Sequence, residues 1–164
     1  MSGRNDGLKF ELTKRIEGIT RSMNRVTYES LATMIMRLDE VSPVGDVELW
    51  SPKNRAKAIR EGYRGGQFRG NWQLGVNVRP TGWVYGKIDP TGINTVSANI
   101  GLIPTAASRG YKFYLVNNVP YARALEDGHS SQMPRHMVAR IRGEFKSMVA
   151  KVCDQIKSEG GRVR

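Results

Sequence analysis

The stretch YRGGQFRGNWQ, residues 63–73, decides between two kinds of chain. Arginine–glycine pairs with interleaved aromatic residues are typical of disordered RNA-binding segments, because guanidinium planes and rings stack on bases while glycine keeps the backbone pliant. In a folded chain the same glycines form a turn, and Phe68 and Trp72 anchor the following strand in a core. Arg64 and Arg69 are then left as contacts to phosphate or to a partner.

The residues that follow this stretch favour the folded interpretation. Apolar and polar or small residues alternate from Trp72 to Val78, which is the period of a half-buried strand. A turn at Thr81-Gly82 allows residues 83–85 to extend that strand or pair with it. The segment YKFYLV, residues 111–116, predicts a second strand. Between them the spacing predicts a short helix over residues 96–107, kinked by Pro104.

Two longer helices are predicted at the ends of the chain. The first covers residues 8–40 and ends at Ser42-Pro43. Its apolar residues recur at steps of three, four and five: Leu8, Leu12, Ile16, Ile19, Met23, Val26, Leu31, Ile35 and Leu38. Because this helix is long for a globular protein, either its stripe packs within its own domain or part of it faces another subunit. The second helix covers residues 136–158, and a helical turn is expected at 121–127.

The length of 164 residues is that of one domain with a real core. We expect a single domain over 1–164, divided into the helix at 8–40, a basic projecting loop at 41–70 with at most a turn of helix at 55–60, the sheet and helices at 71–158, and a flexible tail at 159–164. The loop is long and rich in proline and glycine, which is typical of functional or mobile segments.

The charge of the chain points to an anionic partner. There are 26 Lys and Arg against 15 Asp and Glu, a net charge of +11. Such a field attracts nucleic acid, an acidic protein or an anionic surface without choosing among them. The candidate residues of the basic loop, facing DNA or a partner, are Lys53, Arg55, Lys57, Arg60, Arg64 and Arg69.

Other features of the sequence exclude several classes of protein. One cysteine, Cys153, allows no intramolecular disulfide, and no apolar run approaches the roughly 20 residues of a membrane helix. The N-terminus lacks the apolar core of a signal peptide, so the protein is expected in the cytoplasm where it is made. No P-loop motif is present.

A metal or acid–base site has one candidate cluster, which consists of Glu126, Asp127, His129 and His136. The spacing matches no metal-binding motif, and a polar loop accounts for these residues as turn formers. Ser130 and Ser131 adjoin His129 only in sequence, which is no nucleophile–base geometry. We expect no catalytic, cofactor-binding or metal-binding residues.

Three stretches of the chain carry a resemblance to a known family. They are SPVGDVELWSP (42–52), GYRGGQFRGNWQLG (62–75) and YLVNNVPYARALEDGHSSQMPRHMVARIRGEF (114–145), with an Asp-Pro turn, DPTG, at 89–92. The chain resembles the bacteriophage tail-completion or neck proteins of the head–tail junction. Two departures are the segment PKNRAKAIRE (52–61), which is more basic than the family's spacer, and His129, which stands where an aromatic residue is usual.

The resemblance implies an α+β subunit in which a small antiparallel sheet packs against a long N-terminal and a C-terminal helix. It implies a homo-oligomeric ring, hexameric or dodecameric, that joins the head connector or portal adaptor to tail proteins and lets DNA pass. No catalysis is implied. The subunit would be made in the host cytoplasm and end in the virion. Head-to-tail cyclic assembly needs two unlike surfaces on each subunit. Candidates are the stripe of the long helix and a segment with Asn117, Asn118, Pro120, Tyr121, Arg123 and Glu126.

Three alternatives stay open. A tail terminator, which caps the tail tube, occupies the neighbouring layer of the same assembly. A nucleic-acid-binding protein would act through YRGGQFRG, and a nuclease would use Glu126, Asp127 and His129.

Overall fold

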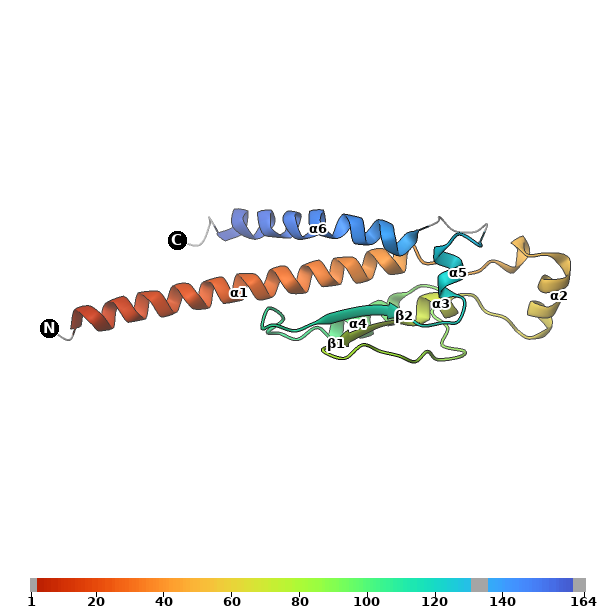
Figure 1. Cartoon of the computed structure of the whole chain (residues 1–164), viewed down its shortest axis with the longest axis horizontal. Coiled ribbons are helices and arrows are strands. Elements are labelled where there is room, and N and C mark those ends of the chain that lie inside the picture. The colour runs from red at the N-terminus through yellow and green to blue at the C-terminus, as the bar shows by residue number, and fades with distance from the viewer. Residues whose placement is uncertain (1–2, 131–135, 161–164) are drawn as a thin grey trace.

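Two long helices set the long axis of the molecule. The computed structural model describes residues 3–130 and 136–160. Helix α1 spans Gly3–Glu40, and α6, Met137–Gly160, runs back along it in the opposite direction (Figure 1). Both begin and end close to the predicted bounds. The predicted tail at 159–164 was wrong for residues 159 and 160, which belong to α6, and the remainder lies outside the described residues.

A small sheet lies on the other side of α1. Strands β1 (Trp72–Val76) and β2 (Phe113–Asn117) pair antiparallel, with Trp72 opposite Asn117 and Val76 opposite Phe113. Helix α4, Ile93–Gly101, packs against both β1 and α1. Figure 1 shows α1 between α6 and the layer of β1, β2 and α4. The mixed helix and antiparallel-sheet class predicted from the sequence is therefore confirmed.

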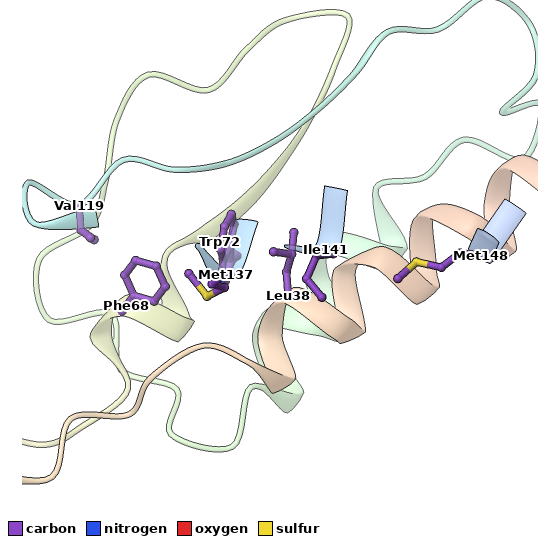
Figure 2. Packing of buried hydrophobic residues seen from close by; sticks show 7 residues of the cluster. All are labelled: Leu38, Phe68, Trp72, Val119, Met137, Ile141 and Met148. Atoms are coloured by element: carbon purple, nitrogen blue, oxygen red, sulfur yellow. The ribbon is translucent and has the colours of Figure 1, made fainter. Parts of the chain in front are cut away.

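The main core joins α1, the short helix α3 (Gln67–Gly70), β1 and α6. Its buried residues form the row drawn in Figure 2: Leu38, Phe68, Trp72, Val119, Met137, Ile141 and Met148. The indole N–H of Trp72, a polar group within this core, has a hydrogen-bond partner, because it donates to Ser42 Oγ at 2.7 Å. Ser42 Oγ in turn donates to the Leu38 carbonyl at 2.6 Å. Buried polar groups are costly unless paired in this way. The predicted anchoring by Phe68 and Trp72 is confirmed.

A second core cluster lies between α1, the sheet and the end of α4. Its buried residues are Ala32, Ile35, Leu74, Ile103 and Ala107. Here the side chain of Asn99, from α4, forms hydrogen bonds with the backbone of β1, as a neighbouring strand would. Its Oδ1 accepts from the Leu74 N–H at 2.7 Å, and its Nδ2 donates to the Trp72 carbonyl at 3.0 Å. These bonds satisfy backbone groups that the two-stranded sheet leaves unpaired, as buried groups require.

The segment 41–70 contains more helix than predicted. It forms a 3₁₀ turn at Val47–Leu49, helix α2 at Pro52–Arg60 and the short helix α3 at Gln67–Gly70. Pro52 favours a helix start, because its fixed φ suits the first helical position and its missing N–H would have no partner there. The prediction of a loop with one helical turn at 55–60 was therefore wrong. Figure 1 shows α2 at the end of the molecule opposite the N-terminus.

Three predicted elements have different bounds. Strand β1 stops at Val76 because Asn77 adopts a left-handed conformation with φ of 63°. Residues 83–85 form no strand, since the Asn71 side chain pairs with both backbone groups of Val84 instead. Helix α4 covers residues 93–101 rather than 96–107 and ends before Pro104, which removes a backbone donor. The turn of helix expected at 121–127 is α5, Ala122–Glu126.

Two glycines are required where loops approach the core. Gly66 has a φ of 100°, and a Cβ there would lie 2.5 Å from the Pro90 backbone nitrogen. Gly92 has a φ of 76°, and its Cβ would lie 1.7 Å from Asp39 Oδ2. Both positions therefore demand glycine on conformation and on space. The turn predicted at Gly65-Gly66 is confirmed.

Candidate functional site

Helix α2 carries an exposed basic face. Lys53, Lys57 and Arg60 project from it, and Arg64 follows in the next loop. Among the described residues none forms an ion pair with these four side chains. Arg55 differs from them, because its guanidinium pairs with Glu48. Four of the six basic residues predicted to face DNA or a partner thus lie free at this end of the molecule.

Arg69 does not belong with them, and its predicted exposure was wrong. Its side chain is only 15% exposed. Nη1 donates to the Pro90 carbonyl at 2.7 Å, and Nη2 donates to the Ser42 carbonyl at 2.9 Å. Asp39 Oδ2 lies 3.7 Å from Nε. Arg69 therefore ties the end of α1 to α3 and to the turn before α4, which is a structural role.

Asp39 is buried in this same network. Burial raises the pKa of its carboxyl from the ordinary value of 3.8 to about 6, the nearby Arg69 works in the opposite direction, and Asp89 adds to the rise. Asp39 Oδ1 accepts no hydrogen bond from any described residue, so no hydrogen bond at that oxygen offsets the effect of burial on the pKa.

We expect the Asp39 carboxyl to make stability depend on pH. Its pKa is higher in the folded chain than in the unfolded one, so between pH 4 and 6 the folded chain holds a proton on Asp39 that the unfolded chain has lost. Binding this proton stabilises the folded state, and the stabilisation is lost as pH rises through that window. Urea unfolding of the wild type and of Asp39→Asn from pH 4 to 7 measures the effect as a difference. That difference should change by about 1–3 kcal/mol. A difference that stays constant with pH would contradict this role.

Asp89 has the opposite electrostatic behaviour and fixes the start of α4. Burial acts to raise its pKa, but hydrogen bonds from Thr95, Thr91 and Gly92 together bring it below the ordinary value. The N–H groups of Gly92 and Thr95 donate to its two carboxylate oxygens at 3.0 and 2.7 Å. A carboxylate at a helix N-terminus satisfies free N–H groups and complements the helix dipole.

The predicted partner segment after β2 divides into internal and exposed residues. Asn117 Nδ2 donates to the Phe68 carbonyl at 2.7 Å, and Asn118 Nδ2 donates to the Pro80 carbonyl at 3.0 Å. Glu126 accepts from the N–H groups of Val138 and Ala139, and so caps the start of α6. The side chains of these three predicted interface residues make contacts within the chain.

The other three residues of that segment remain at the surface. Pro120 is exposed, Tyr121 is 40% exposed, and the Arg123 side chain is 92% exposed. Tyr121 also packs on Phe68, with ring centroids 6.4 Å apart.

Two members of the candidate metal or acid–base cluster make structural contacts. Glu126 serves as the cap of α6, and Asp127 lies 3.5 Å from Arg123. Within residues 3–130 and 136–160, no three His, Cys, Asp or Glu side chains gather in an arrangement that could hold a metal ion. Ser131 lies outside the described residues.

A cleft beside α2 was not foreseen from the sequence. Its volume is about 650 Å³, and it is lined by residues of α2 and the preceding Trp50, by Tyr63, Arg64 and Gln67, and by Tyr85, Gly86 and Ile88. An adjoining hollow of about 440 Å³ shares Trp50, Tyr63, Gln67 and Tyr85 with it. The only signal in the sequence was the basic character of the segment, because the aromatic residues come from positions up to 35 apart.

The N-terminal half of α1 exposes an apolar stripe. We define the α1 stripe as Leu8, Leu12, Ile16, Ile19 and Met23, which are 70, 57, 54, 61 and 53% exposed. Figure 1 shows the N-terminal turns of α1 extending past the last described turn of α6. Among the described residues no helix combines the length and apolar character needed to cross a membrane.

An apolar groove continues the α1 stripe. It has a volume of about 670 Å³ and lies between α1 and the last turns of α6. Ile19 and Met23 belong to both the stripe and the groove, and Cys153 and Ile156 line the α6 side. Together they form one continuous apolar surface.

The fold and these surfaces define an α+β protein whose two ends differ in chemistry. One end is apolar along α1, and the other is basic and aromatic around α2 (Figure 1). Comparison of the chain with protein-family models, with curated proteins and with solved structures gives no match.

Proposed function

We propose that the protein is a structural subunit of the head–tail junction of a tailed bacteriophage. In this proposal it forms a homo-oligomeric ring, hexameric or dodecameric, that joins the head connector to the tail tube and lets DNA pass. The observation that carries the proposal is the uncovered α1 stripe, together with a surface of different chemistry at the other end of the molecule. Closed rings assemble through head-to-tail contacts between two unlike patches of identical subunits.

The α1 stripe needs a partner for physical reasons. A helical stretch without packing contacts is only marginally stable in water, because most helical stability in proteins comes from packing of an apolar face. Burying each leucine, isoleucine or methionine of the stripe would contribute roughly 1.5–3 kcal/mol. Contiguous apolar surface on this scale is typical of an interaction site.

A second copy of this chain suits the α1 stripe best. Charges of both signs lie around it, since Lys9, Lys14, Arg15 and Arg21 are positive and Glu11 and Glu17 are negative, so a second copy of this helix can offer an opposite charge to either kind. The chain as a whole carries +11, and identical subunits therefore need an apolar contact to offset their long-range repulsion.

A tail terminator ring, which caps the tail tube, is the second candidate. It uses the same two surfaces and differs only in its layer within the virion. Which proteins bind the two faces of the ring separates them: a neck subunit binds a head connector on one face, whereas a terminator binds the last ring of the tube.

The test of the ring is the molar mass of the purified chain in solution by light scattering. We expect a single species at six or twelve times the 18.4 kDa of the chain. A monomer at every concentration, alone and after mixing with head-connector and tail-tube proteins, would rule the proposal out.

A further inference from the structure

We infer that the cleft between α2 and residues 85–88 binds single-stranded nucleic acid, with a base stacked on its aromatic rings and the flanking phosphates on its cations. This inference rests on the cleft of a single subunit and does not depend on the ring. It differs from binding by a disordered RGG-type segment, because the rings and cations belong to folded parts of the chain that line one cleft.

Aromatic rings from three separate segments meet at the cleft. Trp50 precedes α2 and lies against Tyr63, with ring centroids 4.9 Å apart and planes at 53°. Tyr85 also lines the cleft and is 84% exposed. Its ring makes an edge-to-face contact with Trp83, with centroids 6.1 Å apart and planes at 75°, and the rest of the ring is open to a ligand. Every base has a flat face that can stack on such a ring, whatever its identity.

Cations flank these rings. Lys57 and Arg64 line the cleft, and Glu61 is the one acid among its lining residues. No described residue forms an ion pair with Lys57 or Arg64, and Lys53 and Arg60 add charge along the same helix. Unpaired cations beside open rings can bind the phosphates on either side of a stacked base. The cleft volume of about 650 Å³ falls within the range of small-ligand sites, so a nucleotide fits.

The same features select a single strand. In a duplex the base faces are covered by their neighbours, so only the phosphates could use this surface. An acidic peptide would likewise use the cations but has no need of three rings. The combination of rings and cations therefore favours unpaired nucleotides over either of these ligands.

The experiment is a fluorescence anisotropy titration of the full-length protein with labelled dodecathymidylate, with a duplex of equal length, and with polyglutamate as competitor. We expect the single strand to bind at least about tenfold more tightly than the duplex. Tyr85→Ala should weaken that binding by about 5- to 100-fold. Lys57→Gln should reduce the slope of log affinity against log salt by about 0.7.

Matched controls separate the cleft from the overall charge. Lys151→Gln removes the same charge from exposed α6, and Tyr111→Ala removes a tyrosine that is 36% exposed and away from the cleft. Both should bind dodecathymidylate like the wild type. Tyr85 and Lys57 are exposed, so their variants should keep the wild-type circular dichroism spectrum. Equal affinity for duplex and single strand, equal losses for Tyr85→Ala and Tyr111→Ala, or stronger binding of polyglutamate would each overturn the inference.

Discussion

A chain carrying Ile16→Asp and Ile19→Asp is expected to be a monomer under conditions in which the wild type forms a ring. Both residues belong to the α1 stripe and are 54 and 61% exposed, so the substitutions cost the folded monomer little. At an apolar contact the same two carboxylates would have to be buried without partners, which is among the most destabilising changes known. Subunit affinity should fall by at least about a hundredfold. Sedimentation velocity at a series of concentrations measures the change.

The matched control is Phe10→Asp. Phe10 is 67% exposed, as apolar as its neighbours, and belongs to the same part of α1. It lies two residues from both Leu8 and Leu12, which places it roughly half a turn away from the α1 stripe. This variant should keep the wild-type mass. If Phe10→Asp dissociates the ring as fully as the double variant, or if the double variant stays assembled, the α1 stripe is not the subunit contact.

The second large effect is expected within the core. Trp72→Ala should lower the free energy of unfolding by about 3–5 kcal/mol. The substitution leaves a cavity in the core cluster that contains Leu38 and Ile141, and it removes the indole N–H that donates a hydrogen bond to Ser42 Oγ. Domains have only about 5–15 kcal/mol of total stability, so the loss is a large share of the whole. Urea unfolding followed by circular dichroism measures it.

Trp72→Phe separates packing from hydrogen bonding. It keeps most of the buried ring but leaves Ser42 Oγ without the indole N–H, and we expect a loss of about 1–3 kcal/mol. The two losses should therefore differ clearly. A Trp72→Ala variant that unfolds within about 1 kcal/mol of the wild type would show that this residue does not hold the core together.

Regular periodicity explains what could be predicted of the fold. The alternation around Leu74 and the three- and four-residue steps of α6 each reflect one face that packs against the core, so both elements were predicted, although β1 ends two residues before the alternation does. Helix α2 gave no such signal, because Ala58 is its single buried residue and the rest of it faces solvent. An exposed helix leaves no apolar pattern in the sequence.

Side chains that replace backbone partners explain other differences. Asn71 pairs with Val84 and Asn99 pairs with Leu74, so loops and edges are fixed by contacts between residues 13 and 25 positions apart. Local sequence contains no trace of such pairs. Residues 83–85 were therefore predicted to extend or pair with the strand, whereas the side-chain amide of Asn71 pairs with the backbone of Val84.

The basic residues show the same limit at the candidate site. Arg69 and Arg64 look equivalent in YRGGQFRGNWQ, yet Arg69 is bound to the Pro90 and Ser42 carbonyls whereas Arg64 lines the cleft. Only the three-dimensional arrangement separates a structural arginine from an available one. The aromatic residues of the cleft, Trp50 and Tyr85, come together through the same long-range packing.

The central claim is that this chain closes into a ring through unlike surfaces, and electron microscopy of the purified protein tests it most directly. We expect class averages that show closed rings with six- or twelvefold symmetry and a central opening, with the extended N-terminal half of α1 lying against the neighbouring subunit. Particles of monomer size, or open filaments of indefinite length, would contradict the account.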